Sequence, residues 1–174
     1  MQALVNSYDA LTDRETLATP EHLVRWMRRH GLDPGTRPIR RSDVARVHRF
    51  RESLRAVLAG HDGSAPRPGS IASLNEIAER ACLRVAISDD GVPTLLVRDG
   101  GVDGAVAAVL RAAVMGGSEA RWDRLKACPE CGWVFYDHSR NRSGSWCTMA
   151  ICGSRAKMRA YRRRRSAPGR RPPT

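Results

Sequence analysis

The chain has 174 residues, of which 41% are hydrophobic but only 5% aromatic, and its formal net charge is +12 at pH 7. This length allows one ordinary hydrophobic core with a small additional module, and no apolar stretch reaches the roughly 20 residues of a membrane-spanning helix. The first residues, MQALVNSYDALTDRE, contain no basic segment followed by an apolar one, so we expect no secretory signal and a cytoplasmic protein.

A helix is predicted within residues 18–32, ATPEHLVRWMRRHGL. Thr19 is a suitable N-cap because its hydroxyl oxygen can accept a hydrogen bond from a backbone N–H of the first turn, and Pro20 fits the first helical position. Gly31 follows the predicted end, as is typical of helix C-termini. Both ends of this helix are therefore marked in the sequence.

Two further helices are predicted in the first half of the chain. One begins at Ser42 and Asp43 and continues, with apolar residues at helical spacing, to Gly60. A linker rich in Gly, Pro and Ser follows it. The other covers residues 70–81 and should turn four apolar side chains inward. These are Ile71, Leu74, Ile77 and Ala78.

The pattern then changes from helix to strand. Two short β-rich runs lie on either side of Asp89-Asp90-Gly91, and Asp-Gly is a strong signal for a hairpin turn. Residues 101–117 follow as a fourth helix that is apolar on nearly all sides, so we expect it at the centre of the core.

Four cysteines near the C-terminus form two close pairs, with two residues between the members of the first pair and four between those of the second. Two such pairs joined by a short span are how a chain builds a tetrahedral tetrathiolate site for zinc. Disulfides are the alternative, but they need an oxidising compartment. Four thiolates leave no position for water or substrate, so we expect one structural zinc ion. The predicted ligands are Cys128, Cys131, Cys147 and Cys152.

Residues around these pairs fit the same module. Gly132 and Gly153 each follow the second cysteine of a pair, and we expect both to adopt the positive φ that glycine tolerates. The run WVFYD predicts a strand between the pairs. Asp137 should hydrogen-bond the backbone of the module, and His138 is not needed as a ligand because four thiols complete the shell. Cys82 stands apart and is expected to be a small buried side chain.

Charge is distributed unevenly along the chain. Residues 1–120 carry 16 Lys/Arg against 15 Asp/Glu, whereas residues 121–174 carry 14 against 3. Such asymmetry indicates a polyanion as partner, although charge runs also occur as solvated faces. Binding to an anionic membrane surface would need a large apolar helix face, which the basic segment lacks.

A final helix is predicted in SRAKMRAYRRRR, capped by Ser154 and directed by the metal site that precedes it. Its cations, together with two arginines in the turn between the cysteine pairs, are the candidate nucleic-acid contacts. Four consecutive arginines cannot all face one groove, so some should reach phosphates on either side. The candidates are Arg140, Arg142, Ser154, Arg155, Lys157, Arg159, Arg162 and Arg163.

Aromatic residues are concentrated in the same module and allow a second interpretation. Exposed rings could stack on unpaired bases, as they do in proteins that bind single strands. A module with so little core needs some of these rings for packing, and Phe135 and Trp146 are expected to have that role. Trp133 and Tyr136 remain candidate contacts.

The run from Cys128 to Lys157 resembles the CGNR zinc finger, a module that usually follows an α-rich N-terminal region called the ABATE domain. Near the start, Leu4-Val5-Asn6-Ser7 and Thr19-Pro20-Glu21 resemble the signature of that region. The resemblance implies a bacterial protein of the kind described as stress-induced transcription regulators. The tetrapeptide that names the finger reads CGSR here, with Ser154 in place of asparagine. The matching residues of the finger are Cys128, Pro129, Cys131, Phe135, Asp137, Ser139, Asn141, Ser143, Trp146, Cys147, Met149, Cys152, Gly153, Arg155 and Lys157.

Together these patterns predict an α+β protein that is mostly α. A helical ABATE-like domain with one β-hairpin should cover residues 1–120, and a treble-clef-like zinc finger with a basic helix residues 121–165. The remaining residues, 166–174, are too rich in Pro and Gly to order and should form a disordered tail.

We therefore expect a cytoplasmic transcriptional regulator whose finger and basic helix contact DNA. A regulator needs an input, so the N-terminal domain is a candidate sensor of a small-molecule effector or a protein partner. No enzyme is expected, because the histidines of this domain stand singly and it has no phosphate-binding glycine loop. Two alternatives stay open: an RNA-binding protein that uses the same finger, and a protein–protein adaptor with a purely structural zinc.

Overall fold

The computed structural model describes residues 1–63, 65–97, 100–118 and 121–166. The described chain is predominantly helical and has three small two-stranded sheets, so the predicted α+β class with mostly helix is confirmed. The helices are α1 (Gln2–Val5), α2 (Pro20–Arg29), α3 (Arg41–Ala59), α4 (Ser70–Ala78), α5 (Gly101–Ser118) and α6 (Ser154–Ser166). Short turns of 3-10 helix, η1 (Gly60–Asp62) and η2 (Trp122–Arg124), connect some of them.

All three sheets are antiparallel pairs. They are β1 (Tyr8–Asp9) with β2 (Arg14–Glu15), β3 (Leu83–Ile87) with β4 (Pro93–Val97), and β5 (Leu125–Ala127) with β6 (Val134–Tyr136). Of the tail predicted for residues 166–174, only Ser166 is described, as the last residue of α6, and the rest lies outside the described residues.

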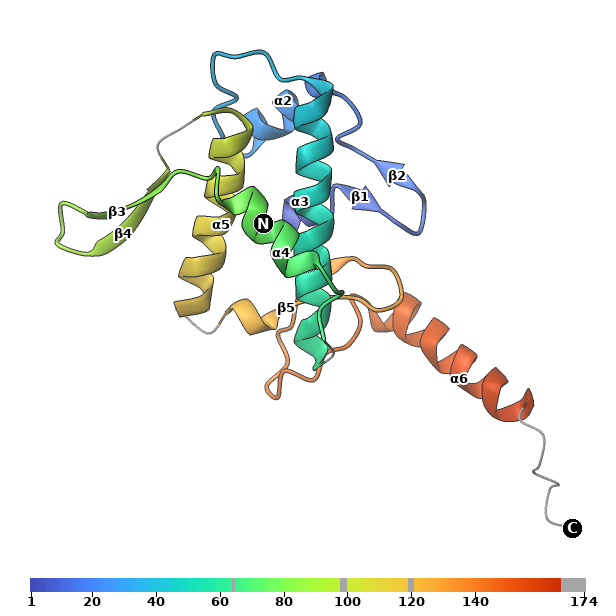
Figure 1. Ribbon diagram of the computed structural model, residues 1–174. Coiled ribbons are helices and arrows are strands. Elements are labelled where there is room, and N and C mark those ends of the chain that lie inside the picture. The colour runs from blue at the N-terminus through green and yellow to red at the C-terminus, as the bar shows by residue number, and fades with distance from the viewer. Residues whose placement is uncertain (64, 98–99, 119–120, 167–174) are drawn as a thin grey trace, which may run out of the picture.

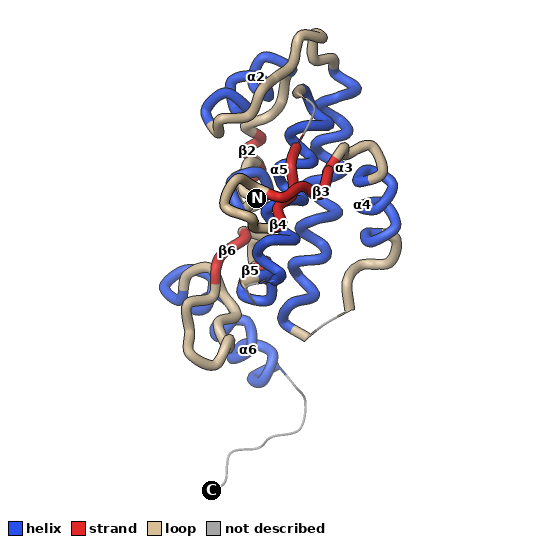
Figure 2. Tube along the Cα trace, turned by 90° about the vertical axis from the view of Figure 1, so that its left-hand side faces the viewer, coloured by secondary structure: helices blue, strands red, loops and turns tan. Residues whose placement is uncertain are grey.

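Helix α3 runs through the middle of the molecule, and the other helices of the first 118 residues pack around it (Figures 1 and 2). Its side chains Val47, Phe50, Leu54 and Leu58 recur every three or four residues, so they lie on one face, and all four are buried. They form the centre of the main core together with buried residues of α1, α2 and α5.

The predicted helix ends are partly confirmed. Thr19 caps α2, since its hydroxyl oxygen accepts a hydrogen bond from the His22 N–H at 3.3 Å. Gly31 follows the end of this helix as predicted and has a left-handed φ of +67°. Helix α3, however, begins before Ser42. The carboxylate of Asp43 accepts a hydrogen bond from the Arg40 N–H at 2.9 Å, so the helix is capped from its first turn and starts at Arg41.

Three burial predictions are wrong. Ile71 on α4 is 53% exposed, and Cys82, expected in the core, is exposed between α4 and β3. Helix α5 is buried only over its first half, while Val114 and Met115 near its end are 55% and 40% exposed. The last turns of α5 are exposed although their side chains are apolar, because no other described element covers them completely.

The hairpin of β3 and β4 is formed as predicted. The N–H of Ser88 donates to the carbonyl of Val92 at 3.0 Å, and Gly91 has a φ of +79° in the turn. The hairpin projects from the helical body (Figure 1), which leaves Val85 and Ile87 of β3 72% and 66% exposed.

A buried cation joins the N-terminal segment to α3. Arg51 is 4% exposed, and its guanidinium donates to both carboxylate oxygens of Glu15, at 2.9 and 2.7 Å. It also donates to the hydroxyl of Ser7 at 3.0 Å. A buried charge needs such partners, because its desolvation is otherwise costly. Ser7 therefore has a structural role.

The β5–β6 hairpin belongs to the same core as the helices. Ala127 of β5 and Val134 of β6 are buried in one cluster with Phe50 and Leu54 of α3. The cysteine-rich segment is thus packed against the N-terminal part of the chain. None of the helices in the described ranges is both long and apolar enough to cross a bilayer.

Candidate metal centre and basic helix

The first cysteine pair lies in the tight turn between β5 and β6. The N–H of Gly132 donates to the carbonyl of Cys128 at 2.7 Å, and the N–H of Cys128 donates to the carbonyl of Trp133 at 2.9 Å. Gly132 has a φ of +69°, as predicted, and a Cβ there would lie 3.0 Å from the guanidinium of Arg55. Glycine is therefore needed both for the turn and for the close approach of α3.

The second pair is placed by η3 (Met149–Gly153), a short π-helical turn that leads directly into α6. The N–H groups of Cys152 and Gly153 both donate to the carbonyl of Thr148, each at 3.1 Å. Gly153 is not among the described residues with positive φ, so that prediction is wrong. A Cβ at Gly153 would clash with the sulfur of Met149, so a larger residue there would require that exposed side chain to move.

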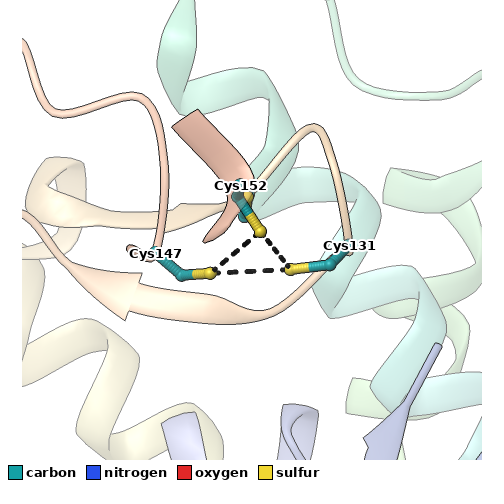
Figure 3. Close-up of side chains that lie close together, drawn as sticks. Cys131, Cys147 and Cys152 are labelled. Atoms are coloured by element: carbon teal, nitrogen blue, oxygen red, sulfur yellow. Dashed lines mark hydrogen bonds between the residues drawn. The ribbon is translucent and has the colours of Figure 1, made fainter. Parts of the chain in front are cut away.

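Four sulfur atoms converge between these two turns. The Sγ atoms of Cys131, Cys147 and Cys152 lie 3.6 Å from one another (Figure 3). The Sγ atom of Cys128 completes the group, in which all members lie within 4.8 Å of one another. A tetrahedral site with Zn–S bonds of about 2.3 Å has sulfur atoms about 3.8 Å apart. The predicted cysteines thus lie together and fit a single structural zinc ion.

The sulfur atoms suit a divalent cation electrostatically. Burial raises the pKa of Cys152 to about 11 and moves the pKa of Cys131 still further up, so a cation is needed to hold these groups as thiolates. Burial alone would also raise the pKa of Cys128, but hydrogen bonds from the N–H groups of Cys147 and Cys131 outweigh it and lower that pKa. Such N–H donors stabilise the charge of a metal-bound sulfur.

Most of the sulfur group is covered. Cys128, Cys131 and Cys152 are buried, Cys147 is half-buried, and the rings of Phe135 and Trp146 pack against this group, as predicted for these two aromatics. With sulfur at every position, a metal here would stabilise the fold of the segment and would not bind a substrate.

An ion pair fixes the loop between the cysteine pairs. The carboxylate of Asp137 is buried and accepts hydrogen bonds from the Lys126 ammonium at 2.8 Å and from the N–H groups of Ser139 and Gly144 at 2.9 Å. Lys126 also donates to the carbonyls of Gly144, at 3.1 Å, and Arg142. Asp137 has the expected role. Nothing in the sequence around Lys126, however, distinguishes this buried cation from the exposed arginines near it.

Helix α6 extends from the metal centre away from the rest of the molecule (Figure 1), and none of its residues is buried. Ser154 is its first residue and does not cap it. Because α6 continues directly from η3, the hydroxyl of Ser154 donates backwards to the carbonyl of Met149 at 3.2 Å. The other predicted contacts on α6 are exposed. They are Arg155, Lys157, Arg159, Arg162 and Arg163.

Arg159 differs from the other cations of α6. Its guanidinium forms an ion pair with the carboxylate of Glu130, whose side chain is only 6% exposed in the turn between Cys128 and Cys131. This contact joins the helix to the first cysteine pair and helps to set its direction. Arg155, one turn earlier, is exposed.

The two loop candidates, Arg140 and Arg142, are exposed as well. Arg142 has a left-handed φ of +52°, and its guanidinium lies 3.4 Å from the carboxylate of Asp123. Within the described residues, neither arginine shares a hydrogen bond or an ion pair with α6. The described contacts therefore do not fix the position of the two loop arginines relative to the cations of α6.

The remaining aromatics lie on the surface of the finger. Trp133 is 37% exposed, and Tyr136 is half-buried with its ring centroid 4.8 Å from that of His138. His138 is not part of the sulfur group, so four thiols complete the candidate shell as predicted.

The metal-binding turn is held from the N-terminal part of the chain. The guanidinium of Arg55 on α3 donates to the carbonyl of Gly132 at 2.6 Å and to the carbonyl of Val5 at 2.7 Å. The side-chain amide of Gln2 donates to the carbonyl of Val134 at 3.0 Å. These contacts bridge α1, α3 and the finger.

A hollow of about 520 Å³ lies between α5 and the loop after α2 on the described surface. It is a candidate site for the small-molecule effector that the N-terminal domain is expected to bind. Leu32, Arg111 and Met115 are among its lining residues. This volume is within the range of small-molecule sites, roughly 300–1,000 Å³.

Two family models match the sequence. The ABATE model, whose description is "Putative stress-induced transcription regulator", matches residues 2–116, and the model of the CGNR zinc finger matches residues 124–165. The second match contains all four cysteines and almost all of α6. These matches confirm the resemblance seen in the sequence. No curated protein matches the chain.

Proposed function

The chain belongs to the ABATE family, and on that premise we propose that it is a transcription regulator that binds duplex DNA through α6. One observation carries this proposal. Helix α6 has no buried residue, and its second half exposes four consecutive arginines, Arg162 to Arg165. An α-helix fits the major groove of B-DNA, and cations on either side of it can reach phosphates.

The fixed direction of α6 favours duplex DNA over a flexible polyanion as its binding partner. The helix continues from η3, which carries the metal ligand Cys152, and Arg159 ties it to Glu130 in the first turn. A helix held at its start can enter a groove without first losing much conformational freedom. In this account one structural zinc ion, held by the four cysteines, is required for DNA binding because it positions α6.

We propose that the N-terminal domain supplies the regulatory input by binding a small effector or a protein partner. The contacts of Arg55 and Gln2 with the finger would transmit this input to α6. We further propose that the protein is cytoplasmic and acts by binding rather than as an enzyme. Among the described residues, a structural zinc would use all four thiols of the metal centre as ligands, which leaves no coordination position for a substrate.

The test compares two triple variants of the full chain that lose the same charge. Arg155, Lys157 and Arg162 on α6 are replaced by glutamine in one variant, and the exposed Arg25, Arg28 and Arg29 on α2 in the other. Fluorescence anisotropy with a duplex DNA should show at least a tenfold loss of affinity for the α6 variant and little change for the α2 variant, because only phosphate-facing cations release counterions. Equal losses would contradict the proposal.

A second candidate, binding of single-stranded RNA, is supported by one specific observation: Trp133 is 37% exposed and lines one groove with Ile151 of η3, the turn that leads into α6. If this candidate is correct, single-stranded RNA should compete with duplex DNA for the protein. Trp133→Ala should then weaken the complex with the single strand more than the α6 substitutions do. The same anisotropy titration, with a labelled single strand of RNA, separates this candidate from duplex binding.

A further inference from the structure

A groove of about 460 Å³ lies where the finger meets the N-terminal segment. On its finger side the groove is lined by aromatic and apolar side chains and by three of the four candidate metal ligands, Cys131, Cys147 and Cys152. Gln2 of α1, Asp9 and Leu11 form its other side.

Three large apolar side chains that line this groove are exposed. Trp133, Leu11 and Ile151 are 37%, 47% and 51% exposed, and they come from three separate parts of the sequence. Phe135, which packs against the sulfur atoms, lines the groove as well, but Trp133, Leu11 and Ile151 do not belong to that packing. An exposed apolar cluster of this kind marks a binding surface.

The charges around the groove define what it can hold. No lysine or arginine is among its described lining residues, so the groove itself is unsuited to a phosphate. Arg155 follows Ile151 by four residues in the continuous run of η3 and α6, which places it on the same side of the helix. A flat uncharged ring could therefore occupy the groove while an attached phosphate lies against the cations of α6.

Asp9 adds one polar acceptor at the rim. Its carboxylate already accepts hydrogen bonds from the N–H of Leu11 and the hydroxyl of Thr12, both at 2.9 Å, and the pKa of Asp9 is lowered first of all by the Leu11 bond. An ionised carboxylate can accept about four hydrogen bonds, so acceptor capacity remains. An amino group on a ring in the groove is a suitable donor for it.

We propose that this groove binds one unpaired nucleobase, with its ring stacked on Trp133 and an exocyclic amino group directed to Asp9. The inference deepens the proposed DNA-binding function and rests on it: the base belongs to a nucleotide whose phosphate is held by α6. Aromatic side chains stack on any base, and the carboxylate favours bases that carry an amino group over thymine.

The test uses the zinc-loaded full chain and a short duplex with one bulged 2-aminopurine, whose fluorescence falls when it stacks, beside the same duplex fully paired. Wild type should bind the bulged duplex about 5- to 100-fold more tightly than the paired one and quench its fluorescence. Trp133→Ala should abolish this preference but leave the affinity for the paired duplex unchanged. Trp133→Phe, which keeps a ring, should retain most of the preference.

A second substitution tests the acceptor. Asp9→Asn keeps one oxygen, which can still accept the hydrogen bond from the Leu11 N–H, but it replaces the oxygen that accepts from Thr12 with an amide NH2 group and removes the charge. It should therefore lower the preference for a bulged adenine over a bulged thymine several-fold. An unchanged preference would refute the role given to Asp9.

The base could come from a nucleic-acid strand or from a free nucleotide, and a third arm separates these sources. Trp133-dependent quenching of free 2-aminopurine nucleotide at micromolar concentration supports a free ligand, and quenching confined to the bulged duplex supports a strand. The proposal is overturned if neither probe is quenched, or if Trp133→Ala leaves the quenching intact. If the wild-type protein did not bind the paired duplex, the proposed DNA-binding function would be refuted. The experiment with the free nucleotide would still show whether the groove binds a base.

Discussion

The side-chain amide of Asn6 pairs with the backbone of Val134 as a neighbouring β-strand would. Its Nδ2 donates to the Val134 carbonyl at 2.8 Å, and its Oδ1 accepts a hydrogen bond from the Val134 N–H at 2.8 Å. Val134 is fully buried and lies 128 positions along the chain from Asn6. The two bonds tie the start of the N-terminal domain to strand β6 of the finger, so the two parts share both a core and a backbone contact.

Replacing Asn6 with alanine should destabilise the whole chain. Asn6→Ala leaves the N–H of Val134 without a partner in a buried position, and we expect a loss of about 2–4 kcal/mol in the free energy of unfolding. Denaturant titration measures it. Gln2→Ala is the control and should cost less than about 1 kcal/mol, because the Val134 carbonyl keeps its bond from Asn6. Equal costs for the two variants would mean that the pairing has no special role.

Removing one cysteine of the second pair should remove the metal. Cys147→Ser is expected to reduce bound zinc from one ion per chain to nearly none, and Cys82→Ser, at an exposed position, should leave it unchanged. Metal analysis of the purified variants is the measurement. Far-UV circular dichroism should retain the helices around α3, while the thermal midpoint falls because the β5–β6 hairpin contributes Val134 to their core. Full zinc content in Cys147→Ser would contradict the assigned site.

The buried ion pair of Asp137 and Lys126 should be essential for the fold of the finger. Burial alone would raise the pKa of Asp137, but hydrogen bonds from Lys126, Ser139 and Gly144 outweigh it and hold that pKa far below its usual range. A carboxyl whose pKa is depressed by folding stabilises the protein above its unfolded pKa of about 3.9, and this contribution is lost as the pH falls through the folded pKa.

Asp137→Asn tests this directly, because it leaves the charge of Lys126 buried without its counter-ion. The expected cost is about 3–5 kcal/mol at neutral pH, with the penalty declining only below about pH 4. Asp123→Asn makes the same chemical change at a carboxylate that is 63% exposed, and it should cost less than about 1 kcal/mol. Unfolding curves of the two variants at pH 7 would refute the prediction if they coincided.

Two arginines one turn apart on α6 should behave differently. Arg155→Ala is expected to weaken duplex binding and to leave the free energy of unfolding within about 0.5 kcal/mol of wild type, since the side chain is exposed. Arg159→Ala should reduce both quantities, because it removes the partner of the buried Glu130 carboxylate. Anisotropy and denaturant titration of each variant decide the matter. If Arg155→Ala left the affinity unchanged, α6 would not contact DNA in the way proposed.

The features that the sequence predicts correctly are those carried by neighbouring residues. The spacing of the cysteines, the Thr19 cap and the Asp-Gly turn each depend on a few consecutive positions. Their geometry is set by local backbone rules, which act in the same way whatever the rest of the chain does. The zinc site could therefore be predicted almost completely, including the structural roles of Phe135 and Trp146.

The features that the sequence does not reveal depend on how distant segments meet. Asn6 with Val134, Arg55 with Gly132 and Lys126 with Asp137 are pairs whose members give no local sign of one another. Ser154 and Gly153 differ from the prediction for a related reason. A π-helical turn leads from Met149 into α6 without a break, so Ser154 has no helix end to cap and Gly153 does not need a positive φ.

The salt dependence of duplex binding tests the central claim, that α6 holds DNA by contacts with its phosphates, most directly. If about 4–7 phosphates are neutralised, the logarithm of the binding constant should fall with the logarithm of salt concentration with a slope of roughly −4 to −6. In the variant with Arg155, Lys157 and Arg162 replaced by glutamine, the slope should become less steep by about 2–3. A slope near zero for wild type, or one that this variant leaves unchanged, would contradict the claim.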